Sequence, residues 1–310
     1  MRPRGHGARP GDITPKPVES PKGLNRSPLC GGLMPSRAVK EHYDSKGEDE
    51  WKRLEKDAYH RLEWLTTIHF LEEYLPRSGM VLDAGGGPGR YATFLAKRGL
   101  RVVLLDLSSV QLEIARRKVA ESGVAPGAVD YVESALPDLS SFSDQRFDAV
   151  LCLGPLSHLV EDAERAAAVE ELVRVTKTGS PLFVSVIGRY AVHRTILQDP
   201  GKHSEFLEPD HREMFEKGVH RDHPPRPTHR RVEGHYFLPE ELRECFEDRG
   251  VETLVVASCE GLADHLQEPL ARLAESEPLW GRWLELHWQT CTDPSILGIS
   301  EHILFVGRKH

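Results

Sequence analysis

Short apolar runs alternate along the chain with amphipathic stretches, and this alternation predicts strands followed by helices. The runs are rich in Val, Leu, Ile and Phe, as buried parallel strands are. They cover residues 81–83, 101–105, 129–133, 147–153, 181–187, 251–258 and 303–306. Between most of them, apolar residues recur at three- and four-residue steps in stretches that stop at glycine, which predicts helices. The order predicts an α/β fold with a doubly wound, seven-stranded, mostly parallel sheet.

Two segments depart from this rhythm and predict additions to the core. From Glu48 to Leu75 the apolar residues keep helical spacing and Pro76 ends the run, so we expect a helical cap before the first strand. Residues 188–235 hold many prolines and charges and seven histidines, which predicts a lid inserted over the carboxyl edge of the sheet.

The first 33 residues are rich in Gly, Pro, Arg and Lys and lack apolar periodicity, so they are expected to form a disordered leader. Met34 opens a more ordinary segment, and we hypothesise that natural initiation lies there. The predicted parts are a leader at 1–33, a cap at 34–78, a cofactor-binding core at 79–187, a lid at 188–235 and the rest of the core at 236–310.

A glycine-dense turn follows the first predicted strand. Gly85, Gly87 and Gly89 give the spacing G-x-G-x-G after Asp83, and a helix is expected directly behind them. Strand, glycine loop and helix together present backbone N–H groups to a ligand at the carboxyl edge of a sheet. The next strand ends in Asp106, about 17 residues past the last glycine, near the place where an acid holds a ribose diol.

With this loop, Asp106 and the later segments in this order, the chain resembles the class I S-adenosylmethionine-dependent methyltransferases. It is most similar to their small-molecule, ubiquinone-biosynthesis-like group. The resemblance covers roughly residues 48–187 and 236–307. It implies a Rossmann-like fold whose seventh strand is antiparallel and inserted beside the fifth, and it implies S-adenosylmethionine as the cofactor.

The resemblance also assigns cofactor contacts. Asp83 is expected to order the loop or to meet the cofactor's amino group, and Asp106 to accept both ribose hydroxyls. The alternative role for Asp106 is to cap the following helix. Many members of the family have an acid where this chain has Ser134, and a serine would bond the adenine amine more weakly. The expected cofactor-binding residues are Asp83, Gly85, Gly86, Gly87, Gly89, Asp106, Leu107, Ser134, Ala135 and Leu153.

Four residues are candidates for binding the methyl acceptor or for acting on it as a general base. His158 follows the fourth strand and is the candidate general base or orienting group, since imidazole titrates near neutrality. The alternative is a histidine bonded to a backbone carbonyl that only lines the pocket. Tyr43 lies where the family often places a flexible flap, so it either touches the ligands or is an exposed tyrosine. Arg189 and Tyr190 follow the fifth strand and would hold an anion and stack on a ring, unless they are a surface arginine and a packing tyrosine.

Composition limits the class of partner. A formal charge of −8 and a pI near 6.1 argue against a dedicated nucleic-acid binder, although a local basic patch remains open. The five cysteines form no C-x-x-C pair, and no apolar run approaches the ~20 residues of a membrane span, so a cytoplasmic protein is expected. The histidines of the lid, among them His220, His223, His229 and His235, are irregularly spaced, and we expect no metal there.

These features predict an enzyme that transfers a methyl group from S-adenosylmethionine to an O, N or C atom of a small molecule. One alternative is a tRNA or protein methyltransferase, whose basic groove would be built from Arg221, Arg226, Arg230 and Arg231. Another is a catalytically silent scaffold, which would not need the loop and Asp106. A nicotinamide oxidoreductase is disfavoured because Arg90 replaces the last glycine of G-x-G-x-x-G.

Overall fold

A computed structural model describes residues 37–208, 211–221 and 232–310. The predictions for the leader at 1–33 and for initiation at Met34 lie outside these residues. So do His223, His229, Arg226, Arg230 and Arg231 of the predicted lid.

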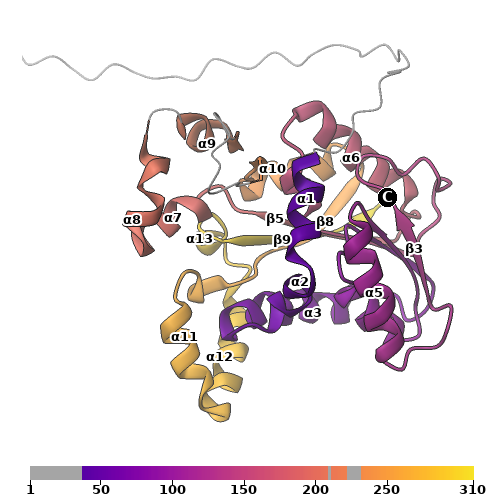
Figure 1. Cartoon of the computed structure of the whole chain (residues 1–310), viewed down its shortest axis with the longest axis horizontal. Coiled ribbons are helices and arrows are strands. Elements are labelled where there is room, and N and C mark those ends of the chain that lie inside the picture. The colour runs from indigo at the N-terminus through magenta and orange to yellow at the C-terminus, as the bar shows by residue number, and fades with distance from the viewer. Residues whose placement is uncertain (1–36, 209–210, 222–231) are drawn as a thin grey trace, which may run out of the picture. The chain divides into compact units, whose positions relative to one another are not determined.

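A seven-stranded sheet forms the centre of the described chain (Figure 1). Its strand order is β3-β2-β1-β4-β5-β9-β8, and β9 runs antiparallel to both of its neighbours while the other pairs are parallel. The predicted doubly wound sheet is therefore confirmed, including the last strand inserted beside the fifth. The strands are β1 Met80–Ala84, β2 Arg101–Asp106, β3 Val129–Glu133, β4 Ala149–Leu153, β5 Pro181–Ile187, β8 Val251–Ser258 and β9 His302–Lys309.

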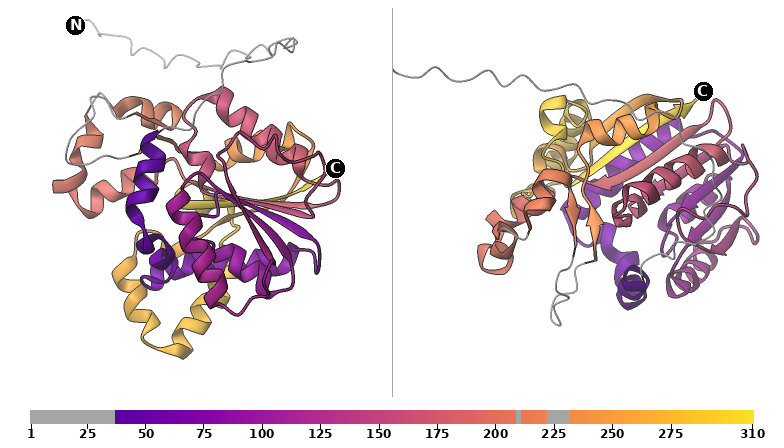
Figure 2. Two further views of the ribbon diagram at one scale, coloured as in Figure 1. Left: turned by 45° about the vertical axis from the view of Figure 1, so that its right-hand side comes forward. Right: turned by 90° about the horizontal axis from the view of Figure 1, so that it is seen from above.

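Helices cover both faces of this sheet (Figures 1 and 2). One apolar cluster joins the sheet to α6 Asp162–Val175 and α10 Pro239–Glu247. The other joins it to α3 Ala58–Tyr74, α4 Arg90–Lys97 and α5 Ser109–Glu121. Both faces of the strands are buried, which explains why the strands appear in the sequence as near-continuous apolar runs.

The N-terminal cap is helical, but it is divided where one helix was predicted. It consists of α1 Arg37–Lys46, α2 Glu48–Lys52, the 3-10 helix η1 Arg53–Glu55, and α3. The division falls at Asp57, whose side chain accepts a hydrogen bond from the backbone N–H of His60 at 2.9 Å and so caps α3. The segment expected to be a flexible flap, which contains Tyr43, is part of α1.

The described residues of the inserted segment form short helices and strands. Its elements are α7 Ala191–Gln198, α8 Pro200–His203, η3 Ser204–Leu207, α9 Arg212–Lys217, β6 Val219–His220 and β7 Gly234–His235. Val192, Ile196, Phe206, Met214 and Tyr236 form a small apolar core of their own. The histidine-rich composition concealed this core because its apolar residues are far apart in the sequence.

The C-terminal helices stand beside the cap. They are η5 Gly261–Ala263, α11 Gln267–Ala274, α12 Glu277–Thr290 and α13 Pro294–Leu297. Trp280 of α12 packs with Tyr59 and Leu62 of α3, as core rather than as an aromatic binding site. Among the described residues, no helix is both long and apolar enough to cross a membrane.

Candidate functional site

The glycine loop joins β1 to α4, and its neighbours explain its glycines. Gly85 has φ +76°, and a Cβ there would lie 2.1 Å from Cγ of Pro155, which follows β4. Gly89 has φ +81°, and its Cβ would lie 2.9 Å from Cβ of Ala115 in α5. Side chains at these positions would push the loop away from β4 and α5, so the close approach requires glycine.

Asp106 ties the loop to the end of β2. Its Oδ2 accepts the N–H of Gly87 at 2.8 Å, and its Oδ1 accepts the N–H of Ser108 at 2.9 Å. Burial raises the pKa of this carboxyl to about 6, although both hydrogen bonds favour the charged form. Each oxygen keeps a lone pair for a further donor. Ser108, not Asp106, caps α5, because its side chain accepts the N–H of Gln111.

Asp83 lies beneath the loop. Asp83 is only 1% exposed, and a Cβ at Gly86 would lie 2.5 Å from Asp83 Oδ2. Within the described chain, Oδ2 has no hydrogen-bond partner, while the carboxyl bonds to the backbone of Ala92. Burial, and next the charge of Asp106, raise the pKa of Asp83 to about 7. Of the two predicted roles, this position favours ordering the loop over direct contact with a ligand.

The predicted adenine edge is covered by α1. Lys40 donates to the carbonyl of Leu107 at 2.7 Å and to Glu133 Oε1 at 3.2 Å, so it connects the ends of β2 and β3. The hydroxyl of Ser134 donates to the carbonyl of Asp138 at 3.2 Å, within its own loop.

The two remaining predicted cofactor residues flank this edge. The carbonyl of Ala135 accepts the N–H of Asp138 at 2.8 Å, so Ala135 belongs to the same turn as Ser134. Leu153 ends β4 half-buried, beside the glycine loop. Lys40 was missed in the sequence because nothing local to it signals a contact with residues so far along the chain.

Tyr43 and His158 were predicted separately, and the structure brings them together. The Tyr43 hydroxyl lies 2.8 Å from His158 Nε2, with the two rings edge to face. The backbone of Tyr43 is held by Gln111, whose Nε2 donates to the Tyr43 carbonyl at 2.8 Å. Burial, and next the charge of His42, lower the pKa of His158 to about 4, so its ring is neutral at neutral pH. Burial raises the pKa of Tyr43 above its ordinary value.

Arg189 does not present a free guanidinium. Its side chain is 11% exposed, and it donates to Glu241 Oε2 at 2.6 Å and to the carbonyl of Tyr236 at 3.3 Å. Glu241 also contacts His235 Nε2 at 2.5 Å. The prediction that Arg189 holds an acceptor anion is therefore disfavoured, since the acid of α10 already neutralises it. Tyr190 next to it is 42% exposed, and its ring lies tilted against that of His193, with the centroids 6.2 Å apart.

A cavity of about 470 Å³ lies between the start of α6 and the inserted segment. Arg221, expected as part of a basic groove, lines it and pairs with Glu161 at 2.8 Å. The lining mixes acids and bases and includes Glu161, Asp162, Arg165, Glu213, Lys217, Arg221, His235 and Glu241. This mixture is not a contiguous basic surface for a nucleic acid.

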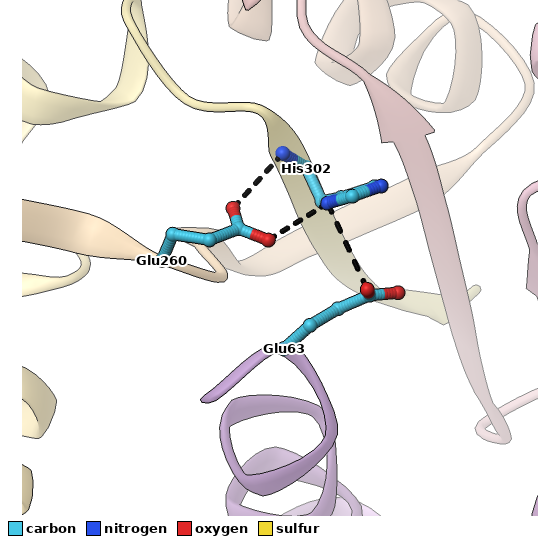
Figure 3. Close-up of side chains that lie close together, drawn as sticks. All are labelled: Glu63, Glu260 and His302. Carbon is cyan, nitrogen blue, oxygen red and sulfur yellow. Dashed lines mark hydrogen bonds and ion pairs between the residues drawn. The ribbon is translucent and has the colours of Figure 1, made fainter. Parts of the chain in front are cut away.

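A buried ionic cluster that the sequence did not indicate lies where α3 meets the start of β9 (Figure 3). Arg53 donates to both oxygens of Glu63, at 2.6 and 3.1 Å, and His302 Nδ1 lies 2.7 Å from Glu260 and 3.9 Å from Glu63. Despite its burial, the two carboxylates raise the pKa of His302 to about 10, so it is a cation. Arg53 lowers the pKa of the buried Glu63 to about 2.

Comparison with known proteins agrees with this geometry. Residues 81–179 match the profile of a family described as a methyltransferase domain. A ubiquinone biosynthesis O-methyltransferase from Hahella chejuensis is 36% identical over 123 residues, which cover 39% of this chain and 49% of that protein. One from Azotobacter vinelandii is 35% identical over 143 residues, 46% of this chain and 56% of that protein. The chain thus spans about half the length of these relatives.

Solved structures extend the likeness to the fold of most of the chain. A SAM-dependent methyltransferase from Methanosarcina mazei matches with a TM-score of 0.53 at 19% identity, covering 77% of this chain and 96% of that one. Magnesium protoporphyrin IX methyltransferase from Synechocystis matches with a TM-score of 0.52 at 17% identity, covering 88% of this chain and 98% of that one.

The predicted resemblance to class I S-adenosylmethionine-dependent methyltransferases is thereby confirmed, with the Rossmann-like methyltransferase fold and with S-adenosylmethionine as the cofactor of this kind of domain. Residues 81–179, which carry the match, contain the glycine loop, Asp106 and His158.

Proposed function

We propose that this protein transfers a methyl group from S-adenosylmethionine to a hydroxyl, amine or carbon of a small molecule. The observation that carries the proposal is the glycine loop fixed by the bond from Gly87 N to Asp106, inside the segment that matches the methyltransferase profile. The O-methyltransferases among the relatives favour a hydroxyl acceptor.

The residues at the ends of β1 and β2 fit the cofactor. The loop 85–89 offers backbone N–H groups without Cβ atoms, and the Asp106 carboxylate keeps lone pairs for the two ribose hydroxyls. Leu107, Ser134, Ala135 and Leu153 would flank the adenine. The raised pKa values of Asp83 and Asp106 also favour a ligand that brings positive charge, because such a ligand stabilises both carboxylates.

When bound, S-adenosylmethionine supplies a methyl group on a positively charged sulfur that leaves as a neutral thioether. The chain's task is then to hold the acceptor in line, exclude water and receive the acceptor's proton. His158 is our candidate for the last role, since its neutral ring has a lone pair available at neutral pH. The Tyr43 hydroxyl on Nε2 would either yield its place to the acceptor or pass the proton on to the ring.

Calorimetric titration with S-adenosylmethionine and S-adenosylhomocysteine tests the cofactor assignment. We expect micromolar binding by the wild type, at least a hundredfold weaker binding by Asp106→Ala, and no binding of NAD. Asp130→Asn changes an exposed acid on the neighbouring strand β3 and should bind like the wild type. A folded wild type that binds neither compound would overturn the proposal and leave the silent scaffold as the better hypothesis.

A positive titration justifies a screen for the acceptor. The protein would be incubated with S-adenosylmethionine labelled in its methyl group and with small-molecule extracts or a panel of phenols, amines and carbon acids. Label in a small molecule, absent with Asp106→Ala, supports the proposal. Label found only in protein or RNA would replace the small-molecule acceptor with a macromolecule.

A further inference from the structure

A second group of polar residues, of which only Glu301 is half-buried rather than buried, lies where the turn after η5 meets the start of β9, apart from the residues assigned to cofactor and acceptor. Asp264 and His265 follow η5, and Glu301 directly precedes β9. One possible ligand atom from each of these three side chains lies within 4.8 Å of the other two. Two carboxylates and an imidazole at such spacing form a set of donors that binds divalent transition metals.

His265 lacks the partners that a buried histidine normally has. Its side chain is 6% exposed, and neither ring nitrogen has a hydrogen-bond partner among the residues that the structure describes. Nε2 lies 3.7 Å from Asp264 Oδ1, so the ring faces the two acids. The backbone of His265 has φ +58°, a left-handed conformation that is uncommon for a residue other than glycine. Because buried polar groups are rarely left unpaired, a buried imidazole without hydrogen-bond partners at this place indicates a missing ligand.

The phenol of Tyr59 adds a second observation. Its oxygen lies 2.8 Å from Asp264 Oδ1 and also contacts Glu301 Oε2. A phenol has one proton and can donate to only one of them. The other carboxylate oxygen then faces a phenol lone pair, which is unfavourable unless a proton or a cation lies between the acids.

The neighbouring cluster of Figure 3 shows what a satisfied arrangement of the same residue types looks like. In Figure 3 the His302 ring lies against Glu260. Arg53, which the figure does not draw, neutralises Glu63. Around Asp264, the cation is Arg194 of α7, which donates to Oδ2 at 2.6 Å and to the Asp264 carbonyl at 3.0 Å. This leaves Oδ1 facing Tyr59 and His265.

We propose that Asp264, His265 and Glu301 bind one divalent transition-metal ion, with Tyr59 completing the site. Imidazole and carboxylate together favour Zn²⁺ or Mn²⁺ over Mg²⁺ and Ca²⁺, which prefer oxygen ligands alone. The ion connects the cap helix α3, the turn after η5 and the start of β9. Arg194 extends the same group to the inserted segment. The role assigned to the ion is to fasten these parts together, and it does not depend on the proposed methyl transfer.

Metal titration of chelator-treated, dialysed protein tests the site. We expect the wild type to bind Zn²⁺ and Mn²⁺ with one site per chain and to unfold at a higher temperature with either ion. His265→Asn removes the imidazole but tolerates the left-handed backbone, and Glu301→Gln removes a ligand charge with little change in shape. Both should bind at least a hundredfold more weakly.

An exposed histidine provides the matched control. His310→Asn removes a ring that lies 3.9 Å from Glu252 at the surface, and it should bind metal like the wild type. Visible absorption of the Co²⁺-loaded wild type should show d–d bands that His265→Asn loses, which a purely structural histidine would not produce. Wild-type protein without a stoichiometric site, or binding that survives in both His265→Asn and Glu301→Gln, would overturn the proposal.

Discussion

Two pairs of buried carboxyl groups lie near the carboxyl edge of the sheet, and they differ in what compensates their charge. Glu63 and Glu260 are paired with Arg53 and His302; the pKa of Glu63 is lowered to about 2, whereas burial raises the pKa of Glu260 although His302 acts in the opposite direction. Asp83 and Asp106 accept hydrogen bonds only from backbone N–H groups among the described residues. Lys40 acts to lower the pKa of Asp106, yet burial raises the pKa values of Asp83 and Asp106 to about 7 and 6.

The difference separates a pair that stabilises the fold from a pair that favours a ligand. The glutamates have their cations within the protein, so the cluster is complete as it stands. The aspartates keep an electrostatic demand that a positively charged cofactor can meet. Strongly perturbed acids without an internal partner are candidates for function on physical grounds.

Breaking the compensated pair should give the largest effect on stability. Glu63→Gln leaves Arg53 without its acid and removes one of the two carboxylates around His302. Loss of one partner of a buried ion pair typically costs about 3–5 kcal/mol of unfolding free energy, and because the Arg53 side chain is 37% exposed we expect a loss at the lower end of this range. Denaturation by urea, followed by circular dichroism, measures this loss.

An exposed acid of the same helix serves as its control. Glu72→Gln removes a surface pair with Arg98 and should cost at most about 1 kcal/mol. Equal losses in the two variants would mean that the Glu63 cluster does not stabilise the fold as inferred.

Asp83, a member of the uncompensated pair, should make the unfolding free energy depend on pH. The pKa of Asp83 is about 7 in the folded protein against an ordinary value of 3.8, so the folded state binds more protons between those values. The contribution of Asp83 to the stability of the ligand-free protein therefore falls as pH rises from about 4 to about 7. Asp83→Asn lacks this contribution because the amide does not titrate, so between pH 4.5 and 7.5 the wild type should lose roughly 3 kcal/mol more stability than the variant.

Unfolding free energies of both proteins at several pH values between 4.5 and 7.5 make the test. Asp130→Asn, at the surface of β3, should leave the slope of the wild type unchanged. Parallel curves for wild type and Asp83→Asn would show that Asp83 is not the uncompensated acid described.

The smallest effect is expected at Tyr43 and His158, two neutral groups that belong to neither pair of carboxylates. Tyr43→Phe removes the 2.8 Å hydrogen bond to Nε2 and keeps the ring. We expect kcat for methyl transfer to fall about tenfold, or ~1.4 kcal/mol, with cofactor affinity unchanged. Steady-state kinetics with an identified acceptor measure it, and a loss confined to cofactor affinity would place Tyr43 outside acceptor chemistry.

The local parts of the site were predictable from the sequence. Gly85 and Gly89 predict a loop with positive φ, and Asp106 ends the next strand at a recognisable spacing. Both could be predicted because each signal lies within a few residues of the backbone that it shapes. The strand order came from the resemblance, since apolar runs alone do not say which strands pair.

Long-range pairing was not predictable. Arg189 was expected to bind an anion, but its acid is Glu241, 52 residues away. Tyr43 and His158 were each predicted as site residues. Their contact with each other was not predicted, because it spans 115 residues and no pattern in the sequence indicates it. The ionic cluster of His302 was missed for the same reason: its members come from three separate elements.

Helix α1 reaches both ends of the site. Lys40 fastens it to Leu107 and Glu133, and Tyr43, one turn further on, fastens it to His158. A movement of α1 that opens the adenine edge must therefore also separate Tyr43 from His158. Under the proposed function, exchange of the cofactor along that edge would break the contact between Tyr43 and His158, so we expect the cofactor to bind before the acceptor and its spent form to leave last.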